Sequence, residues 1–220
     1  TSGYSAGCHR QSTGLYTRVF AGGNAGAGGA AQPLAVSPAP VGAASSTQQL
    51  DFDARLLLGP DPSARAIHAA GGLLHVKKGQ FLAPWDARNI VQKVREAVDG
   101  ADITVLCERG VSFGYNNLVV DMLAIGEMQK LGVPVTIDAT HAVQLPGADP
   151  RTAGASTGGR REGVAVIARA AVVSGADGVF LEFHPEPDKA LCDGPSALPL
   201  TAAAGLLKQL KAVHEAVRAA

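Results

Sequence analysis

Charged and imidazole-bearing residues follow four short apolar stretches of this 220-residue sequence, and each stretch is typical of a buried strand. The stretches are residues 73–77, 103–107, 133–137 and 178–182. The residues at or after their ends are Lys77 and Lys78, Glu108 and Arg109, Asp138 and His141, and Glu182 and His184. Lys77 and Arg109 on one rim could hold a phosphorylated, carboxylated substrate, because Arg offers a bidentate fork and Lys a point charge.

A second group in the same half of the chain consists of His141, Glu182 and Asp193. Such a set could bind a divalent metal or manage protons on a water molecule. Taken singly, a lysine at a strand end is often only solvated, and a lone glutamate in a barrel mouth is usually paired with an arginine. The recurrence of such residues at four strand ends favours an active site.

The elements that must position these residues alternate along the chain. Helices are predicted over 86–98, where Asp86 can cap the start after Pro84, and over 118–131, 162–174 and 201–218. Strand followed by helix, four times, predicts a parallel sheet of the α/β class, the last four units of a (β/α)8 TIM barrel. The active site of such a barrel lies at the carboxyl ends of its strands. Four strands alone would leave two unpaired sheet edges.

Composition narrows the class of protein. The chain has zero net charge and therefore lacks the electrostatic signature of a protein that binds nucleic acid or an anionic membrane. Its hydrophobic fraction of 46% is enough to form a core. Cys8, Cys107 and Cys192 are widely spaced without a CxxC, which suits a reducing compartment. The sequence contains no apolar stretch of membrane-spanning length and no secretory signal, so a cytoplasmic location is expected.

The amino-terminal part has a different composition, and we divide the chain into residues 1–65 and the predicted half-barrel over 66–220. The first fifty residues are rich in Ala, Gly and Ser and carry two charged side chains, Arg10 and Arg18. Three interpretations remain open: a flexible low-complexity extension, a misread or shifted gene segment, and a recognition tail.

From about residue 66 to its end, the sequence resembles the 3-deoxy-D-manno-octulosonate 8-phosphate synthases. The segments that carry the resemblance are KKGQFLAPW (77–85), ERGVSFGYNNLVVDM (108–122), DATHAVQLPG (138–147) and HPEPDKA (184–190). The related 3-deoxy-D-arabino-heptulosonate 7-phosphate synthases share only the Glu-Arg-Gly and His-Pro-Glu-Pro pieces. His75 stands where the family usually has Asn.

The resemblance implies a transferase of lipopolysaccharide precursor synthesis that condenses phosphoenolpyruvate with D-arabinose 5-phosphate and releases phosphate. It also implies a homo-oligomer, a tetramer in the family. The substrate-binding residues it implies are Lys77, Lys78, Arg109 and Asn117, with Arg109 on the phosphate. The residues it places around the water that adds to C2 of phosphoenolpyruvate are His141, Glu182 and Asp193.

In metal-using members the same three residues are ligands, joined by a cysteine of the first strand, where metal-free members have Asn. The segment 192–200 resembles the metal-free branch, whereas 138–147 and 77–80 look more like the metal-using branch. We therefore predict no tightly bound metal, with a divalent ion at these residues only if the parent enzyme is metal-dependent. Residues 1–65 lack the family's Lys-Ala-Asn-Arg-Ser motif for arabinose 5-phosphate. The alternative function is thus an inactive half-barrel, or a pseudo-enzyme that binds phosphorylated metabolites.

Overall fold

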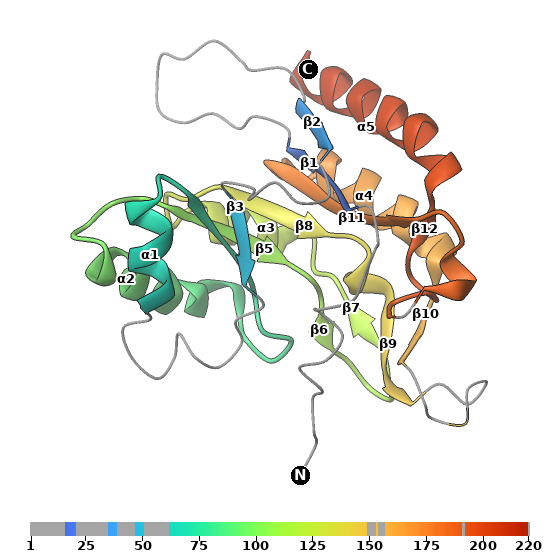
Figure 1. The fold of residues 1–220 in the computed structure, drawn as a ribbon, viewed down its shortest axis with the longest axis horizontal. Helices are drawn as coiled ribbons and strands as arrows, with labels where there is room; N and C mark the ends of the chain where they lie inside the picture. Colours follow the sequence, from blue (N-terminus) through green and yellow to red (C-terminus); the bar gives the residue numbers. More distant parts are fainter. Residues whose placement is uncertain are drawn as a thin grey trace.

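The computed structural model describes residues 16–20, 35–38, 47–50, 62–148, 153, 157–190 and 192–219. Its centre is one sheet with the strand order β2-β1-β11-β8-β5-β4-β3, and β12 also pairs with β11 (Figure 1). These strands are β1 (Tyr16–Phe20), β2 (Ala35–Pro38), β3 (Thr47–Leu50), β4 (Leu73–Lys77), β5 (Thr104–Glu108), β8 (Val135–Asp138), β11 (Gly178–His184) and β12 (Leu198–Pro199).

Five neighbouring strands of this sheet, β3, β4, β5, β8 and β11, are parallel and lie in the order of the chain. That is the wall of a partial (β/α) barrel, so the predicted fold is confirmed. Strand β4 has the predicted bounds. Strands β5 and β8 start and end slightly later than predicted, and their last residues are the acidic Glu108 and Asp138.

The prediction of two unpaired edges beside the four strands is wrong for this structure. Strand β4 is paired in parallel with β3, and β11 is paired in antiparallel fashion with β1, which also pairs with β2. The outer edges of β4 and β11 are therefore paired with β3 and β1. The three interpretations of residues 1–65 concern a segment that lies mostly outside the described residues.

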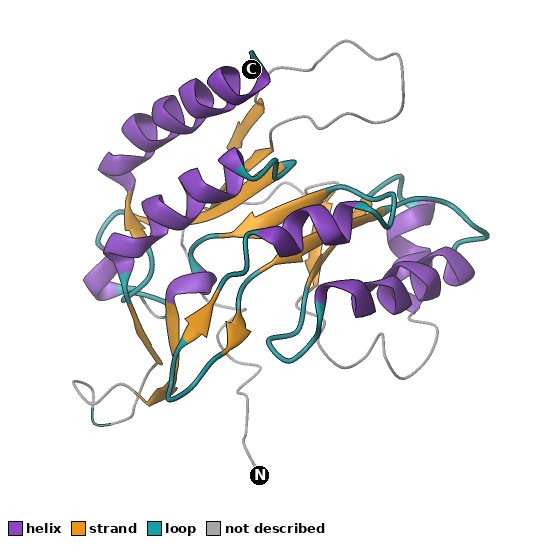
Figure 2. Ribbon diagram, turned by 180° about the vertical axis from the view of Figure 1, so that it is seen from behind, coloured by secondary structure: helices purple, strands orange, loops and turns teal. Residues whose placement is uncertain are grey.

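Helices cover one face of the sheet (Figure 2). They are α1 (Pro62–Ala69), α2 (Arg88–Ala97), α3 (Leu123–Gln129), α4 (Arg161–Val173) and α5 (Ala203–Arg218). Short 3-10 turns lie at η3 (Pro84–Ala87), η4 (His141–Val143), η6 (Pro187–Lys189) and η7 (Leu200–Ala202). Two small antiparallel pairs stand on the loops: β6 (Val111–Ser112) with β7 (Leu118–Val119), and β9 (Gln144–Ala148) with β10 (Thr157–Gly159).

Two local predictions need correction. Asp86 does not cap a helix, because it lies inside the 3-10 turn η3 and α2 begins two residues later. The predicted helix over 118–131 is shorter: Leu118 and Val119 form β7, and α3 starts at Leu123, whose amide donates to the Asp121 carboxylate at 2.9 Å. A β-branched residue paired across a hairpin is more stable extended than in a first helical turn.

The sheet has two chemically different faces, since successive residues of a strand point to opposite sides. The outer face lies under the helices and is apolar; its buried residues include Leu74, Val76, Leu106, Ile137 and Leu181. Helix α2 packs there through Ile90, Val91 and Val94 as predicted, and each buried side chain stabilises the fold by about 1.5–3 kcal/mol. The inner face carries the alternate residues His75, Lys77, Val105, Cys107, Thr136, Asp138, Phe180 and Glu182.

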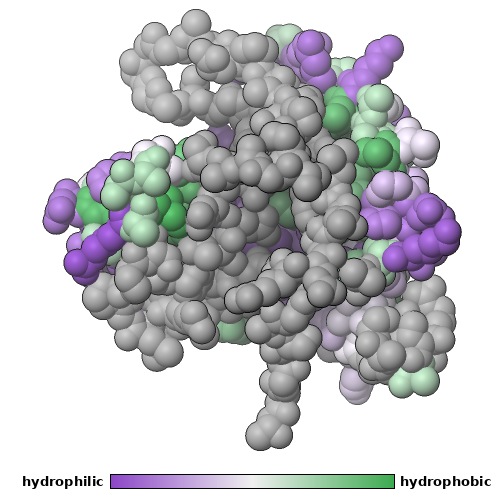
Figure 3. Space-filling view, in the orientation of Figure 1, coloured by the Kyte–Doolittle hydropathy of each residue, from purple (hydrophilic) through white to green (hydrophobic). Residues whose placement is uncertain are grey.

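The surface mixes polar and apolar side chains. At the α1–α2 end, hydrophilic and hydrophobic residues lie side by side in the space-filling view (Figure 3). No helix among the described residues is long and apolar enough to cross a membrane.

Candidate active site

The carboxyl ends of β4 and β8 bring Lys77, Asp138 and His141 into contact. The Lys77 ammonium lies 2.7 Å from Asp138 Oδ2. His141 Nδ1 donates to the same oxygen at 2.7 Å, and the His141 amide donates to Asp138 Oδ1 at 2.9 Å. Asp138 is fully buried, so one carboxylate without access to water holds two neighbouring cationic groups.

The other ring nitrogen of His141 faces two further carboxylates. Nε2 lies 3.8 Å from Glu182 Oε1, at the end of β11, and 3.7 Å from Asp193 Oδ2, in the loop that follows. One ligand atom from each of these three residues lies within 4.8 Å of the others. The structure thus brings together the three residues predicted to surround the water or a metal. The Thr140 hydroxyl, which accepts from the Glu182 amide at 2.9 Å, ties the two strand ends together.

Gln144 connects this group to Arg109. The Arg109 guanidinium donates from Nη2 to Gln144 Oε1 at 3.2 Å, and Gln144 Nε2 donates to Asp193 Oδ1. A continuous set of contacts therefore runs from Lys77 through Asp138 and His141 to Asp193, and from there to Arg109. Both predicted cations belong to one polar network.

A layer beneath the network supports it from the inner face. The Phe180 ring lies 4.4 Å from the Lys77 ammonium, a cation–π distance. His75 stacks on the same ring at 6.3 Å and bonds through Nε2 to the Thr136 hydroxyl at 2.7 Å. Because the Thr136 hydroxyl donates to the Leu106 carbonyl at 3.3 Å, it accepts from His75, which fixes a proton on Nε2.

Mutual charge stabilisation dominates the electrostatics of this group. Burial alone would raise the pKa of Asp138, but the charges of His141 and Lys77 outweigh it and hold that pKa well below its usual range. Burial would likewise lower the pKa of His141, but Asp138 raises it to about 10. The imidazole is therefore a cation at neutral pH, with its second N–H directed at Glu182 and Asp193.

The two outer carboxyls differ from each other. Burial raises the pKa of Glu182 to about 7; His141 opposes this, and Asp138 and Asp193 add to it. Burial also raises the pKa of Asp193, but the hydrogen bond and charge of His141 more than compensate, so that its pKa falls below the usual value. Glu182 can therefore exchange a proton near neutral pH while Asp193 stays ionised.

Lys78 lies on the outer face, away from this group. It is completely buried; its ammonium donates to the Leu82 carbonyl at 2.9 Å and lies 3.6 Å from Glu108 Oε2. Glu108 Oε1 in turn accepts from the amides of Arg109 and Gly110 at 3.0 and 2.7 Å. The pair joins the loops after β4 and β5. A direct contact of Lys78 with substrate stays a prediction.

Asn117 lies in the loop between β6 and β7, half buried, and its side-chain oxygen has no hydrogen-bond partner among the described residues. Its neighbour Asn116, in the left-handed region at φ 49°, accepts from the Gly147 amide and so links this loop to β9. A Cβ at Gly147 would lie 2.7 Å from Asn116 Oδ1, so any larger residue there would displace the Asn116 side chain. Substrate binding by Asn117 also stays a prediction.

With this geometry in place, the comparison with known families decides the relationship. The model of the DAHP synthetase I family matches residues 65–219. The chain belongs to this family. The match covers strands β4, β5, β8 and β11 and all residues of the polar network, and together with the relatives below it confirms the predicted resemblance.

Relatives within this family are aldolases of the octulosonate branch. The chain is 58% identical over 148 residues to the 2-dehydro-3-deoxyphosphooctonate aldolase of Nitratidesulfovibrio vulgaris, covering 67% of this chain and 52% of the relative. It is 53% identical over 154 residues to that of Aromatoleum aromaticum, covering 70% and 54%. The chain spans about half the length of the curated relatives it matches.

The donor set of this chain fits a divalent ion. His141, Glu182 and Asp193 offer one imidazole and two carboxylates, which suit first-row transition metals. The remaining ring nitrogen of His141 donates to Asp138, as the second nitrogen of a metal-binding histidine usually does to a carboxylate.

Two members of the network received no role from the sequence. Asp138 was among the strand-end residues, but its part in holding Lys77 and His141 was not predicted. Gln144 lies in the family segment 138–147, but nothing in its spacing assigns it a role, since its position depends on the 3-10 turn that carries His141.

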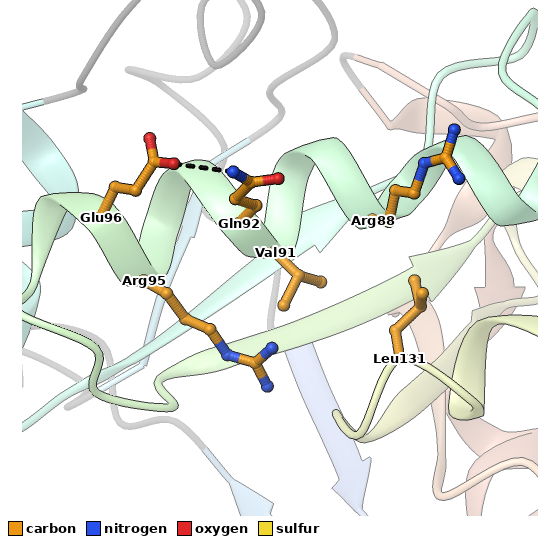
Figure 4. Close-up of a pocket in the computed structure, with 6 residues that line it drawn as sticks. All are labelled: Arg88, Val91, Gln92, Arg95, Glu96 and Leu131. Carbon is orange, nitrogen blue, oxygen red and sulfur yellow. Dashed lines mark hydrogen bonds between the residues drawn. The ribbon is translucent and has the colours of Figure 1, made fainter.

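A surface hollow of about 350 Å³ lies outside the network, between α2 and the end of α3 (Figure 4). Its lining is formed by Arg88, Val91, Gln92, Arg95, Glu96 and Leu131. Arg95 is paired with Asp102 at 2.5 Å, and no residue of the network reaches the hollow. It supplies a useful control position, Arg88, for the arginine of the site.

Proposed function

We propose that this chain carries the phosphoenolpyruvate-binding half of an active site that condenses phosphoenolpyruvate with D-arabinose 5-phosphate. The products would be 3-deoxy-D-manno-octulosonate 8-phosphate and phosphate, within lipopolysaccharide precursor synthesis. The proposal assigns this site to residues 66–220 and transfers the activity of the curated relatives to the chain.

One observation carries the proposal: the contacts that join Lys77 and Arg109 to His141, Glu182 and Asp193 at one edge of the sheet. Phosphoenolpyruvate carries a phosphate and a carboxylate close together, so it needs two cationic groups on rigid supports. The Arg109 guanidinium would take the phosphate, since it can form two parallel hydrogen bonds. The Lys77 ammonium, set above Phe180, would take the remaining negative charge.

The other three residues would manage the water that adds to C2 of phosphoenolpyruvate while C3 attacks the aldehyde. Glu182, with its pKa raised to about 7, is the group suited to accept the proton of that water. His141 stays protonated through Asp138 and can donate to developing negative charge. Asp193 stays ionised and orients His141 from the other side.

A divalent ion, where one is bound, would be held by His141, Glu182 and Asp193 and would supply electrostatic stabilisation of the water or of substrate oxygens. We expect weak metal binding at most, and dialysis of the chain against a strong chelator would test this.

The proposal includes an oligomer, a tetramer by analogy with the family, and a cytoplasmic location. Phe81, Trp85, Phe113 and Tyr115 expose large aromatic surfaces on the loops after β4 and β5 (72%, 59%, 65% and 102% exposed), which supports burial of these loops in an assembly. A cytoplasmic location follows if the substrates are phosphorylated metabolites, since multiply charged molecules do not cross membranes unaided.

Calorimetric titration of the full chain with phosphoenolpyruvate tests the proposal, followed by an assay for phosphate release with D-arabinose 5-phosphate. Arg109→Lys should weaken phosphoenolpyruvate binding by about 1–3 kcal/mol, because an ammonium cannot form the bidentate contact. The matched control is Arg88→Lys, in the surface hollow of α2, which should bind like the unmodified protein.

Equal binding by the two arginine variants would refute the assignment of Arg109. Binding without phosphate release, in the presence of arabinose 5-phosphate, would favour the alternative function, a half-barrel that binds phosphorylated metabolites without turnover.

A further inference from the structure

We propose that Gln144 is a positioning residue: its side-chain amide links the carboxylate of Asp193 to the guanidinium of Arg109 and thereby orients the group that binds phosphate. The inference rests on the proposed function, because it takes Arg109 as the group that binds the anion. It extends that function by coupling the anion site to the group of His141, Glu182 and Asp193 through one side-chain amide.

The partners of Gln144 leave its amide a single orientation. A guanidinium can only donate and an ionised carboxylate can only accept. The Gln144 oxygen therefore faces Arg109, at 3.2 Å from Nη2, and the Gln144 nitrogen faces Asp193. Exchanging the two amide atoms would place two donors together on one side and two acceptors on the other. The amide of Gln144 therefore fixes the positions of Arg109 and Asp193 relative to each other.

Arg109 depends on this contact for its orientation. Its Nε is buried and has no hydrogen-bond partner among the described residues, so Gln144 supplies the side-chain bond that fixes the plane of the guanidinium. A guanidinium already held in place loses less conformational freedom when an anion binds. Gln144 should therefore strengthen anion binding without touching the anion.

Asp193 is itself held in a single place, which allows it to act as the fixed end of the connection. Its backbone lies in the left-handed region at φ 54°, and its carboxylate also faces His141 and the Cys192 thiol. Removing its charge weakens the hydrogen bond that holds the Gln144 amide, and the effect then reaches Arg109 through that amide. Asn tolerates the left-handed region as well as Asp does, so Asp193→Asn changes the charge with little backbone strain.

The test is a double-mutant cycle read on the dissociation constant of phosphoenolpyruvate, measured by calorimetry on the full chain. The four proteins are the unmodified chain, Gln144→Met, Asp193→Asn and the double variant. We expect Gln144→Met to weaken binding about tenfold in the unmodified background and less than about threefold when Asp193→Asn is present. Loss of a negative charge near the anion changes affinity by the same factor in both backgrounds, so it cancels in the cycle.

A matched control is Gln129→Met. Gln129 also donates to a carboxylate, that of Asp177 at 2.9 Å, but outside the network. It should leave the affinity unchanged and show no coupling to Asp193→Asn. If Gln144→Met does not fold, Gln144→Asn serves instead, because an amide one methylene shorter cannot reach both partners.

The outcomes separate the inference from the proposed function. If the unmodified chain does not bind phosphoenolpyruvate, both fail. If Arg109→Lys weakens binding but Gln144→Met has the same effect in both backgrounds, or tightens binding, only the inference fails.

Discussion

Lys77 and Lys78 are neighbours in the sequence, but they belong to opposite faces of the sheet and to different kinds of environment. On the inner face, the Lys77 ammonium shares Asp138 with His141 and lies over Phe180. On the outer face, Lys78 has two backbone carbonyls and one carboxylate around it, under the helices. Both side chains are almost completely buried.

The difference lies in how many partners each carboxylate has. Glu108 has one cation, Lys78, and two backbone amides, so its pair is closed and serves to hold two loops. Asp138 has two cationic neighbours for one carboxylate, and two further carboxylates, Glu182 on β11 and Asp193 in the following loop, lie close to His141. An arrangement with several charges of each sign can redistribute a proton or accept an anion, whereas a closed pair cannot.

Loss of Lys78 should destabilise the fold more than loss of Lys77. Lys78→Met leaves Glu108 buried without its cation and should lower the free energy of unfolding by about 3–5 kcal/mol in urea titrations. Lys77→Met should cost less than half as much, because His141 still compensates Asp138. Adding Glu108→Gln to Lys78→Met should restore much of the loss, since the amide oxygen still accepts from Arg109 and Gly110. Equal losses for the two lysines would contradict the distinction between the faces.

The inner-face pair of His141 and Asp138 should make stability depend on pH. The folded pKa of His141 is raised from 6.5 to about 10, so its contribution is complete below 6.5 and is lost as pH rises towards 10. The lowered pKa of Asp138 extends the contribution down to the usual aspartate range, near 3.8. Between about pH 3.8 and 6.5, the free energy of unfolding of the unmodified chain should exceed that of His141→Gln by about 2 kcal/mol. This difference should disappear by about pH 10.

Urea titrations across this range measure the difference, and His68→Gln, at an exposed position of α1, is the control. An advantage that stays constant from pH 6.5 to 10 would show that His141 is not held as a cation.

Two buried threonines, one on each face of the sheet, should show the same difference with smaller changes in stability. Thr136, on the inner face, accepts from His75 and donates to the Leu106 carbonyl; Thr104, on the outer face, has no hydrogen-bond partner among the described residues. Thr136→Val should cost about 1–2 kcal/mol because it removes the buried hydrogen bond between His75 and Thr136. Thr104→Val should be neutral or stabilising, since it removes an unsatisfied hydroxyl. Thermal melts of both variants check this, and the reverse order would be incompatible with the contacts.

The last prediction concerns reactivity and not stability: thiol labelling tests whether the inner face of the sheet excludes water. Burial raises the pKa of Cys107, on the inner face, far above the usual thiol range. In the native protein, an alkylating reagent followed by peptide mapping should modify the half-buried Cys192 and leave Cys107 unmodified until the chain unfolds. Rapid native labelling of Cys107 would mean that water enters beneath Lys77. Cys8 lies outside the described residues.

The candidate site was largely predictable because parallel strands share one carboxyl edge. That rule alone places Lys77, Arg109, His141 and Glu182 together. Period-two alternation could also have separated Lys78 from Lys77, since adjacent strand residues face opposite sides. The connection through Gln144 was not predictable, because it requires the conformation of the turn η4 and of the loop that carries Asp193, neither of which has a period in the sequence.

The fold was predictable where the apolar residues have a clear periodicity, as in β4 and in the buried stripe of α2. The prediction failed at 118–122, because an apolar run fits a helix and a hairpin strand equally well there. It also missed that β1 and β3 extend the sheet, because the Ala- and Gly-rich segment has no periodic pattern from which strands can be inferred.

The antiparallel pairing of β1 with β11 has a consequence for protein engineering. Position 16, at the start of β1, is opposite Glu182, whereas position 20, at its end, is opposite Gly178 at the far end of β11. In a parallel neighbour, the residue nearest Glu182 would come from the end of the strand. A designer who wishes to place a new residue next to Glu182 should therefore begin at position 16, because the backbone register of the reversed strand pairs its first residue with Glu182.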